Sequence, residues 1–211
     1  MRSRYGENTQ PFATLPDLSP LKEVVARYGL TPKRPRGQHF LFDSNITNRI
    51  AAAAGDLKKV VVYEVGPGPG GLTRALLGAG ARKVVAVEND LRCIEALREL
   101  VQTFSGRLRV LADNALTLDE ARYVPDGSKI VANLPYNISI ALLLKWLQTP
   151  RRWDSMTLMF QKEVAQRLAA SPGSGNYGRL SVITQWVCTT KTLFDVAPGS
   201  FVPAPKVTST V

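Results

Sequence analysis

Residues 60–72 read VVVYEVGPGPGGL: an apolar run of strand length leads into a turn rich in glycine and proline. Gly66, Gly68 and Gly71 have the G-x-G-x-x-G spacing that lets a backbone come close to a nucleotide. A buried strand before this turn and a helix after it form the first unit of an α/β domain. A dinucleotide-binding turn and a plain tight turn share the spacing, so the rest of the chain has to decide between them.

Outward from this turn, short apolar runs alternate with segments of helical period. The apolar runs predict strands at 60–63, 84–87, 107–111, 130–132 and 156–160. Helices are expected at about 21–28, 44–54, 72–77, 91–104 and 161–169, and also after Asp113 and after Ile138. Residues 182–190 and 193–196, rich in Val, Thr and aromatic residues, predict two late strands. The prediction is a Rossmann-like α/β fold, a mostly parallel sheet with an antiparallel edge and helices on both faces.

Composition narrows the function classes. The 211 residues carry a formal net charge of +10, which fits a polyanion such as nucleic acid as the partner and, taken alone, fits a merely soluble basic protein equally well. No apolar run reaches the roughly 18–20 residues needed to span a bilayer, and the N-terminus lacks the apolar core of a secretory signal. A single histidine, His39, and two distant cysteines give little support for a metal site or a Ser-His-Asp triad. We therefore expect a protein without a membrane span or a bound metal.

Three carboxylates follow three consecutive predicted strands. Glu64 ends the first strand, Glu88 ends the second, and Asp113 follows the third. A carboxylate in the place of Glu88 can accept both ribose hydroxyls of a nucleoside, and one in the place of Asp113 can take the exocyclic amine of an adenine. An acidic end to the first strand is typical of proteins that bind S-adenosylmethionine. The three acids beside the glycine turn therefore predict that cofactor rather than NAD.

The run Asn133-Leu134-Pro135-Tyr136 follows a buried strand and predicts an acceptor site. The N6 amine of adenine is a poor nucleophile, because its lone pair is delocalised into the ring. The amide oxygen of Asn133 and the backbone carbonyl of Leu134 can accept its two N–H groups and localise that lone pair. Pro135 fixes the turn, and Tyr136 can stack on the base and stabilise the transient cation. Without the cofactor motifs, the same run would read as an ordinary strand-to-loop turn.

As a set, these motifs resemble the ribosomal RNA adenine N6,N6-dimethyltransferases (KsgA type) that act on the small subunit. The resemblance covers roughly residues 21–209. Besides the runs at 64–71 and 133–139 and Asp113, it rests on GQHFL (37–41), END (88–90), FQKEV (160–164), YGRLSV (177–182) and FVPAPKV (201–207). His39 is a departure, since the family usually has Asn there, so this contact is expected to differ in its hydrogen bonding.

The resemblance implies the reaction and the residues that perform it. Methyl groups would pass from S-adenosylmethionine to N6 of two adjacent adenosines near the 3′ end of small-subunit rRNA, during ribosome assembly. Phe201 would stack on the target adenine opposite Tyr136, and complete a catalytic group with Asn133, Leu134 and Pro135. The implied cofactor site consists of His39, Leu41, Glu64, Gly66, Gly68, Glu88, Asp113 and Asn133.

The domain organisation and the RNA contacts are further expectations. We expect a flexible extension over 1–20, a methyltransferase domain over 21–205, and at 206–211 the start of a linker; the resemblance implies a small helical C-terminal domain beyond it. The protein is expected to be a monomer that works in the cytoplasm on the assembling small ribosomal subunit, with mitochondria as the alternative location. The candidate RNA-binding residues, each with a solvated surface position as the alternative, are Lys33, Arg34, Arg36, Arg151 and Arg152.

Three other functions fit part of the sequence. Large-subunit rRNA adenine methyltransferases of the antibiotic-resistance type are related, but YGRLS and FxPxPKV favour the small-subunit group. A non-catalytic mitochondrial transcription or ribosome factor can share the fold, although the intact run Asn133–Tyr136 favours catalysis. An NAD-dependent oxidoreductase shares the glycine turn, but it accounts neither for that run nor for the basic charge nor for Phe201.

Overall fold

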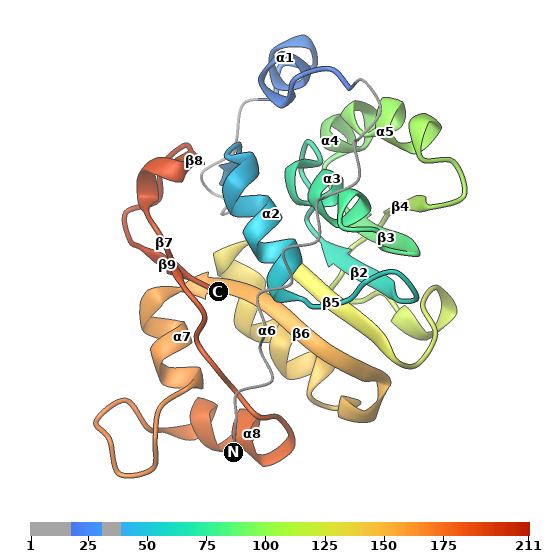
Figure 1. Cartoon of the computed structure of the whole chain (residues 1–211). Helices are drawn as coiled ribbons and strands as arrows, with labels where there is room; N and C mark the ends of the chain where they lie inside the picture. Colours follow the sequence, from blue (N-terminus) through green and yellow to red (C-terminus); the bar gives the residue numbers. More distant parts are fainter. Residues whose placement is uncertain (1–17, 31–38) are drawn as a thin grey trace.

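The computed structural model of the protein describes residues 18–30 and 39–211. Its centre is a seven-stranded sheet with the order β4-β3-β2-β5-β6-β9-β7 (Figure 1). The first five of these strands are parallel, while β9 pairs antiparallel with both β6 and β7. Their bounds are β2 Val61–Val65, β3 Lys83–Glu88, β4 Leu108–Ala112, β5 Ser128–Asn133, β6 Trp153–Gln161, β7 Asp195–Val196 and β9 Ser209–Thr210.

The strand order reverses between β2 and β5. From β2 the chain builds outward through β3 to β4, then returns to add β5 and β6 on the other side of β2. In open α/β sheets, ligands bind beyond the carboxyl ends of the strands at such a switch point. The glycine turn after β2 and the Asn133 run after β5 both lie at this point, so the topology places the two predicted motifs side by side.

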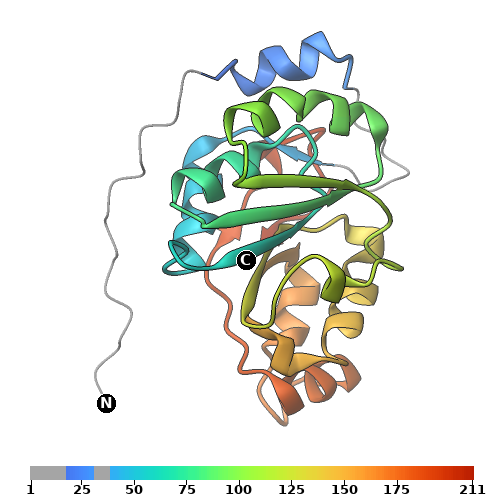
Figure 2. The same cartoon turned by 90° about the vertical axis from the view of Figure 1, so that its right-hand side faces the viewer.

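Helices cover both faces of the sheet, as Figure 2 shows. Val62, Val84 and Ala86 pack on one face against α2 (Ser44–Ala53), α3 (Gly71–Gly78) and α5 (Arg98–Thr103). Tyr63 and Val85 point to the other face, which α6 (Tyr136–Trp146) and α7 (Lys162–Leu168) cover. This two-residue alternation is what a strand with two buried faces requires, and it confirms the predicted fold class. Two further helices are α1 (Leu21–Arg27) and α4 (Leu91–Ala96).

A second, two-stranded sheet was not predicted. In it, β1 (Phe40–Leu41) pairs antiparallel with β8 (Phe201–Val202), and Leu41 lies opposite Phe201. Strands of two residues are too short to leave a periodic signal in the sequence. The pairing brings the GQHFL and FVPAPKV runs together, although they are far apart in the chain.

Three secondary-structure predictions were wrong. Residues 182–190 were predicted as a strand, but Arg179–Val187 form the helix α8. Its buried residues, Leu180, Ser181 and Thr184, have helical spacing, and the Ser181 hydroxyl accepts from the Gly178 N–H (3.1 Å) and donates to the Arg167 carbonyl. These contacts override the strand propensity of Val and Thr.

The other two errors concern predicted helices. Instead of a helix after Asp113, the chain forms turns and one short 3₁₀ segment, η2 (Glu120–Arg122). The helix predicted at 91–104 is divided at Leu97 into α4 and α5. In addition, residues 209–210 form β9 inside the sheet, where a linker had been expected, and the proposed flexible extension at 1–20 lies mostly outside the described residues.

Gly71, the first residue of α3, marks a close approach between the glycine turn and β1. A Cβ added there would lie 2.7 Å from the carbonyl oxygen of Leu41. Because that oxygen belongs to the backbone, it cannot rotate away, and β1 or α3 would have to shift. We expect Gly71→Ala to lower the free energy of unfolding by about 1–3 kcal/mol, as measured by urea denaturation.

Gly175→Ala is the matched control, because a Cβ at Gly175 would meet no atom within 4 Å. It should change the free energy of unfolding by less than about 0.5 kcal/mol. Equal stability of the two variants would show that the approach at Gly71 imposes no constraint.

Candidate functional site

A cavity of about 350 Å³ lies at the carboxyl ends of the strands, at the switch point between β2 and β5. This volume is within the range of small-molecule sites. Six of the eight residues predicted to bind the cofactor line it: His39, Gly66, Gly68, Glu88, Asp113 and Asn133. The predicted acceptor residues Leu134, Pro135 and Tyr136 line the same cavity. The two predicted sites are therefore parts of one cavity.

The glycine turn is a cradle that only glycine can form without strain. Gly66, Gly68 and Gly70 have φ values of 69°, 54° and 96°, in the left-handed region where a side chain is disfavoured. Two backbone N–H groups of the turn donate hydrogen bonds to β3. The Gly66 N–H donates to the Val87 carbonyl (2.9 Å), and the Gly68 N–H donates to the Glu88 carboxylate (3.1 Å). The backbone of residues 66–68 thus forms one wall of the cavity.

Glu88, the last residue of β3, has a carboxylate that backbone donors hold in place. Besides the Gly68 N–H, it accepts from the N–H groups of Asn89 and Asp90, both at 2.9 Å. Burial raises the pKa of Glu88, while these three donors act in the opposite direction. The side chain is therefore fixed at the cavity wall before any ligand arrives.

Glu64 is the penultimate residue of β2 and is almost completely buried. Its carboxylate accepts from the Thr73 hydroxyl on α3 (2.7 Å). It does not line the main cavity, but together with Leu41 it lines a small adjoining recess of about 30 Å³. Burial raises the pKa of Glu64 to about 8; the Thr73 hydroxyl opposes this shift and the nearby Glu88 carboxylate adds to it. Glu64 and Leu41, the two remaining predicted cofactor residues, thus lie behind the cavity wall.

This raised pKa makes the stability of the ligand-free protein depend on pH. Between about pH 4.5 and 8 the folded protein retains a proton on Glu64 that the unfolded chain has released. The favourable contribution of Glu64 is therefore complete below this window and is lost as the pH rises through about 8.

We expect the free energy of unfolding of the wild type to fall across this window, by up to about 1.4 kcal/mol per pH unit from this group. Glu64→Gln should reduce that slope and be the more stable protein at the alkaline end, as measured by urea denaturation in a pH series. The raised pKa of Glu88 remains in both proteins and serves as the common background. Parallel curves for the two proteins would contradict the assignment.

The acceptor run is positioned by β5 and by the start of α6. Asn133 is the last residue of β5, and its amide nitrogen donates to the His39 backbone carbonyl (3.3 Å). With the nitrogen engaged there, the oxygen of the same amide is the atom that can accept an N–H group. Pro135 precedes α6 with φ −58°, and its ring is 3.5 Å from where a Cβ on Gly66 would stand. The cofactor turn and the acceptor run are thus in close proximity.

Tyr136 and Phe201, the two predicted stacking residues, differ in their surroundings. The Tyr136 hydroxyl bonds to the Ser209 hydroxyl of β9 (2.5 Å), and its ring centroid is 5.3 Å from that of His39. Phe201 is buried in the core, with its ring centroid 6.4 Å from that of His39, and it is not among the residues that line the cavity. The stacking role of Phe201 stays a prediction, whereas Tyr136 lies at the cavity wall.

His39, the residue that departs from the resembled family, bridges β8 and the acceptor run. Its Nδ1 lies 2.7 Å from the Pro203 carbonyl, which fixes the ring beside Tyr136. Its backbone carbonyl is the group that accepts from Asn133. His39, which directly precedes β1, thus lies at one side of the cavity.

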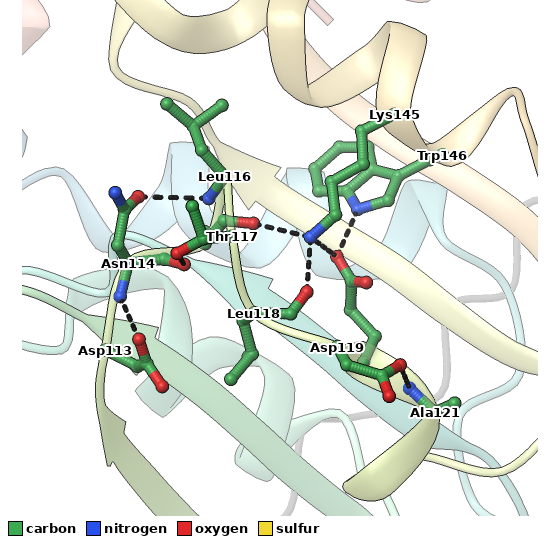
Figure 3. Close-up of polar contacts among 11 residues, drawn as sticks. Asp113, Asn114, Leu116, Thr117, Leu118, Asp119, Ala121, Lys145 and Trp146 are labelled. Carbon is green, nitrogen blue, oxygen red and sulfur yellow. Dashed lines mark hydrogen bonds and ion pairs between the residues drawn. The ribbon is translucent and has the colours of Figure 1, made fainter.

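The loop after β4 supplies cavity residues that the sequence analysis missed. Asp113 lines the cavity as predicted, and so do Asn114, Ala115 and Leu116. Figure 3 shows the polar contacts of this loop. The Asp113 carboxylate accepts from the Asn114 N–H (2.7 Å), and the Asn114 side chain accepts from the Leu116 N–H (3.0 Å). The Asn114–Leu116 bond is an Asx turn, which Asn favours, but the helix predicted after Asp113 left no place for it.

The basic residues proposed for RNA lie away from this cavity or outside the described residues. Lys33, Arg34 and Arg36 are among the undescribed residues. Arg151 and Arg152 form η3 (Pro150–Arg152), just before β6 and so at the amino ends of the strands. Arg152 is bonded to Asp126 (2.9 Å) and to the Val124 carbonyl. Their role in RNA binding stays a prediction.

The cavity has the donor and acceptor groups that S-adenosylmethionine requires. Glu88 can accept from ribose hydroxyls, the Asp113 loop can meet an adenine edge, and the glycine turn lets the backbone approach closely. Among residues 18–30 and 39–211, no cluster of His, Cys, Asp and Glu suits a metal ion. No helix in the same ranges is long and apolar enough to cross a membrane.

Comparison with known families and proteins agrees with this site. The family model for ribosomal RNA adenine dimethylase matches residues 30–211. The chain belongs to the ribosomal RNA adenine dimethylase family. Ribosomal RNA small subunit methyltransferase A of Paramagnetospirillum magneticum is 57% identical over 195 residues, covering 92% of this chain and 69% of that protein. Its namesake in Xanthobacter autotrophicus is 54% identical over 204 residues, covering 95% and 71%.

Solved structures of similar proteins have the same fold. A dimethyladenosine transferase from Plasmodium falciparum has a TM-score of 0.73 at 32% identity, covering 82% of this chain and 61% of that one. The 23S rRNA methyltransferase ErmE has a TM-score of 0.68 at 31% identity, covering 81% and 67%. The chain therefore spans between 61% and 71% of the length of these four relatives.

Proposed function

We propose that this chain transfers methyl groups from S-adenosylmethionine to N6 of adenosines in small-subunit rRNA, and so forms N6,N6-dimethyladenosine. One observation carries the proposal: the Asn133–Tyr136 run and the nucleoside-binding carboxylates line a single cavity. A methyl donor held by Glu88 and Asp113 is thereby next to an amine held by Asn133. The family and its structural neighbours are methyltransferases that use this cofactor.

The chain's own groups account for the acceptor half of the reaction. When bound, S-adenosylmethionine supplies an electrophilic methyl group on a sulfonium. Asn133 accepts one N–H of the adenine amine and the Leu134 carbonyl accepts the other, so the nitrogen lone pair points away from both. The Tyr136 ring, fixed through its hydroxyl by Ser209, offers a face for the base and for the positive charge on N6. The N6 proton leaves after transfer, so no strong general base is required.

Similarity to known proteins favours the small subunit as the source of the RNA. The curated relatives at 54–57% identity are named small-subunit methyltransferases, whereas the 23S rRNA methyltransferase is 31% identical. We further propose that the target is a pair of adjacent adenosines near the 3′ end, within an assembling subunit, and that a monomer acts in the cytoplasm. The net charge of +10 supports an RNA partner.

Mapping methylated adenosines tests the proposal. Undermethylated small subunits and large subunits are incubated separately with the protein and labelled S-adenosylmethionine, and the modified positions are read from each rRNA. Dimethylation of two adjacent adenosines in small-subunit rRNA alone is the expected result. Label in the large subunit alone would overturn the assignment to the small subunit, and calorimetric binding of NAD in place of S-adenosylmethionine would overturn the methyltransferase assignment itself.

A further inference from the structure

Lys145, near the end of α6, extends to the loop that follows β4 (Figure 3). Its ammonium group donates to the carbonyl oxygens of Ala115 (2.8 Å) and Leu118 (2.5 Å), and pairs with the Glu120 carboxylate (2.8 Å). An ammonium group has three donors, and here each has an acceptor. Lys145 therefore connects two points of one loop to a helix on the same face of the sheet.

Glu120 holds that ammonium group in place. It is one of the few buried carboxylates outside the cavity, and it also accepts from the indole N–H of Trp146 (3.0 Å). A carboxylate removed from water requires such partners, and the pair with Lys145 is itself partly shielded from solvent. Glu120, Lys145 and Trp146 form a fixed polar cluster, which we call the α6 anchor.

The anchored loop takes part in two sets of contacts. Residues 113–116 line the cavity, while Lys145 binds the same loop through the carbonyls of Ala115 and Leu118. No residue of the α6 anchor lines the cavity. The same helix begins at Tyr136, and Ile138 in its first turn also lines the cavity. One rigid helix thus connects the acceptor wall to the loop that carries Asp113.

We propose that Lys145 and Glu120 are positioning residues that set the specificity of the cofactor site for adenine. Through the Ala115 and Leu118 carbonyls, Lys145 holds the loop in the position in which the Asp113 carboxylate can accept a hydrogen bond from the exocyclic amine of the cofactor's adenine. Without the anchor the loop keeps its own Asx turn at Asn114, but its position relative to the cavity is no longer fixed. The inference rests on the proposed function, because it requires the cavity to hold the adenosyl group.

The test compares two ligands by calorimetry: S-adenosylhomocysteine and S-inosylhomocysteine, which has a carbonyl in place of the adenine amine. The wild type should prefer the adenosyl ligand by about tenfold or more, because Asp113 accepts from an amine and repels a carbonyl. The double variant Lys145→Met/Glu120→Gln removes the anchor without leaving a buried charge unpaired. Its affinity for the adenosyl ligand should fall about tenfold, with little change for the inosyl ligand, so that the preference is largely lost.

Two controls keep a structural effect apart from a positioning effect. Lys129 resembles Lys145, since its ammonium group donates to the Ala54 carbonyl (2.7 Å) and lies 3.7 Å from the Asp154 carboxylate. Unlike Lys145, Lys129 lies at the start of β5, away from the cavity. Lys129→Met should lower stability and leave the ligand preference unchanged. Glu120→Gln alone, which keeps an acceptor for Trp146, should fold and lose part of the preference.

The outcomes separate this inference from the proposed function. A wild-type preference retained in both the double variant and Glu120→Gln would overturn the positioning role, whatever happens to stability. A preference lost equally in Lys129→Met would show that general loosening is the cause, and would also overturn it. A wild type that binds neither ligand would instead overturn the cofactor assignment on which the inference depends.

Discussion

Asn133→Ala should lower the single-turnover rate of methyl transfer by about 10²–10³-fold, at saturating cofactor and with small-subunit RNA in excess. The affinity for S-adenosylhomocysteine should change by no more than about tenfold, the value of a single hydrogen bond. The larger effect falls on the rate because the Asn133 oxygen is expected to bond to N6 most strongly as that nitrogen becomes positive.

The structure gives a reason for this asymmetry. The Asn133 side chain is fixed at the end of β5 by its bond to the His39 carbonyl, so its oxygen is oriented before the base arrives. Alanine removes both the acceptor and the tie to His39. The lone pair of the adenine amine would then remain delocalised into the ring, and the angle at which N6 attacks the methyl group would no longer be fixed.

Asn176→Ala is the matched control for that variant. Asn176 is exposed in the loop before α8, so the same chemical change occurs far from the cavity. Its transfer rate should equal that of the wild type. A normal transfer rate in Asn133→Ala would contradict the proposed acceptor role. A parallel loss of cofactor affinity and transfer rate would show that Asn133 acts on the cofactor alone.

The parallel core of the fold was predictable because local and long-range preferences agree there. Residues 61–63 and 84–87 are apolar on both faces, and a strand in the middle of a parallel sheet requires that pattern. The glycine spacing then fixed the turn between β2 and α3. At α8 the two kinds of preference disagree: Val182 and Thr184 favour a strand, but a buried hydroxyl at Ser181 and the docking surface on α7 determine a helix.

The cofactor site was predictable to the extent that its residues follow strands. Glu88, Asp113 and Asn133 each come at or just after a strand end, and parallel strands bring such positions to one edge. The β1–β8 pair and the α6 anchor follow no such rule. Trp146 and Glu120 are 26 positions apart, and nothing in either local sequence indicates that they meet. Contacts of this kind depend on how a helix is seated on the sheet, which periodicity alone does not determine.

Glu88→Ala should weaken the binding of S-adenosylhomocysteine by about 10²-fold, as measured by calorimetry, because a hydrogen bond to a charged acceptor contributes about 1.5–3 kcal/mol. Glu95→Ala, which removes an exposed carboxylate paired with Arg98 on the surface, is the control and should bind normally. Unchanged affinity in Glu88→Ala would place the ribose elsewhere.

The arrangement around Glu88 sharpens this expectation. A carboxylate has about four lone-pair sites, and three backbone N–H groups occupy three of them here, which leaves one free. One ribose hydroxyl can therefore bind directly, while the second requires the Gly68 contact, the longest of the three at 3.1 Å, to lengthen. A cofactor analogue without the 2′-hydroxyl should accordingly lose about tenfold in affinity for the wild type and almost nothing for Glu88→Ala.

Glu88→Gln should bind the cofactor nearly as weakly as the alanine variant, because its amide NH₂ would face one of those backbone donors. Normal binding by Glu88→Gln would show that the charge and the backbone hydrogen bonds at this position are dispensable.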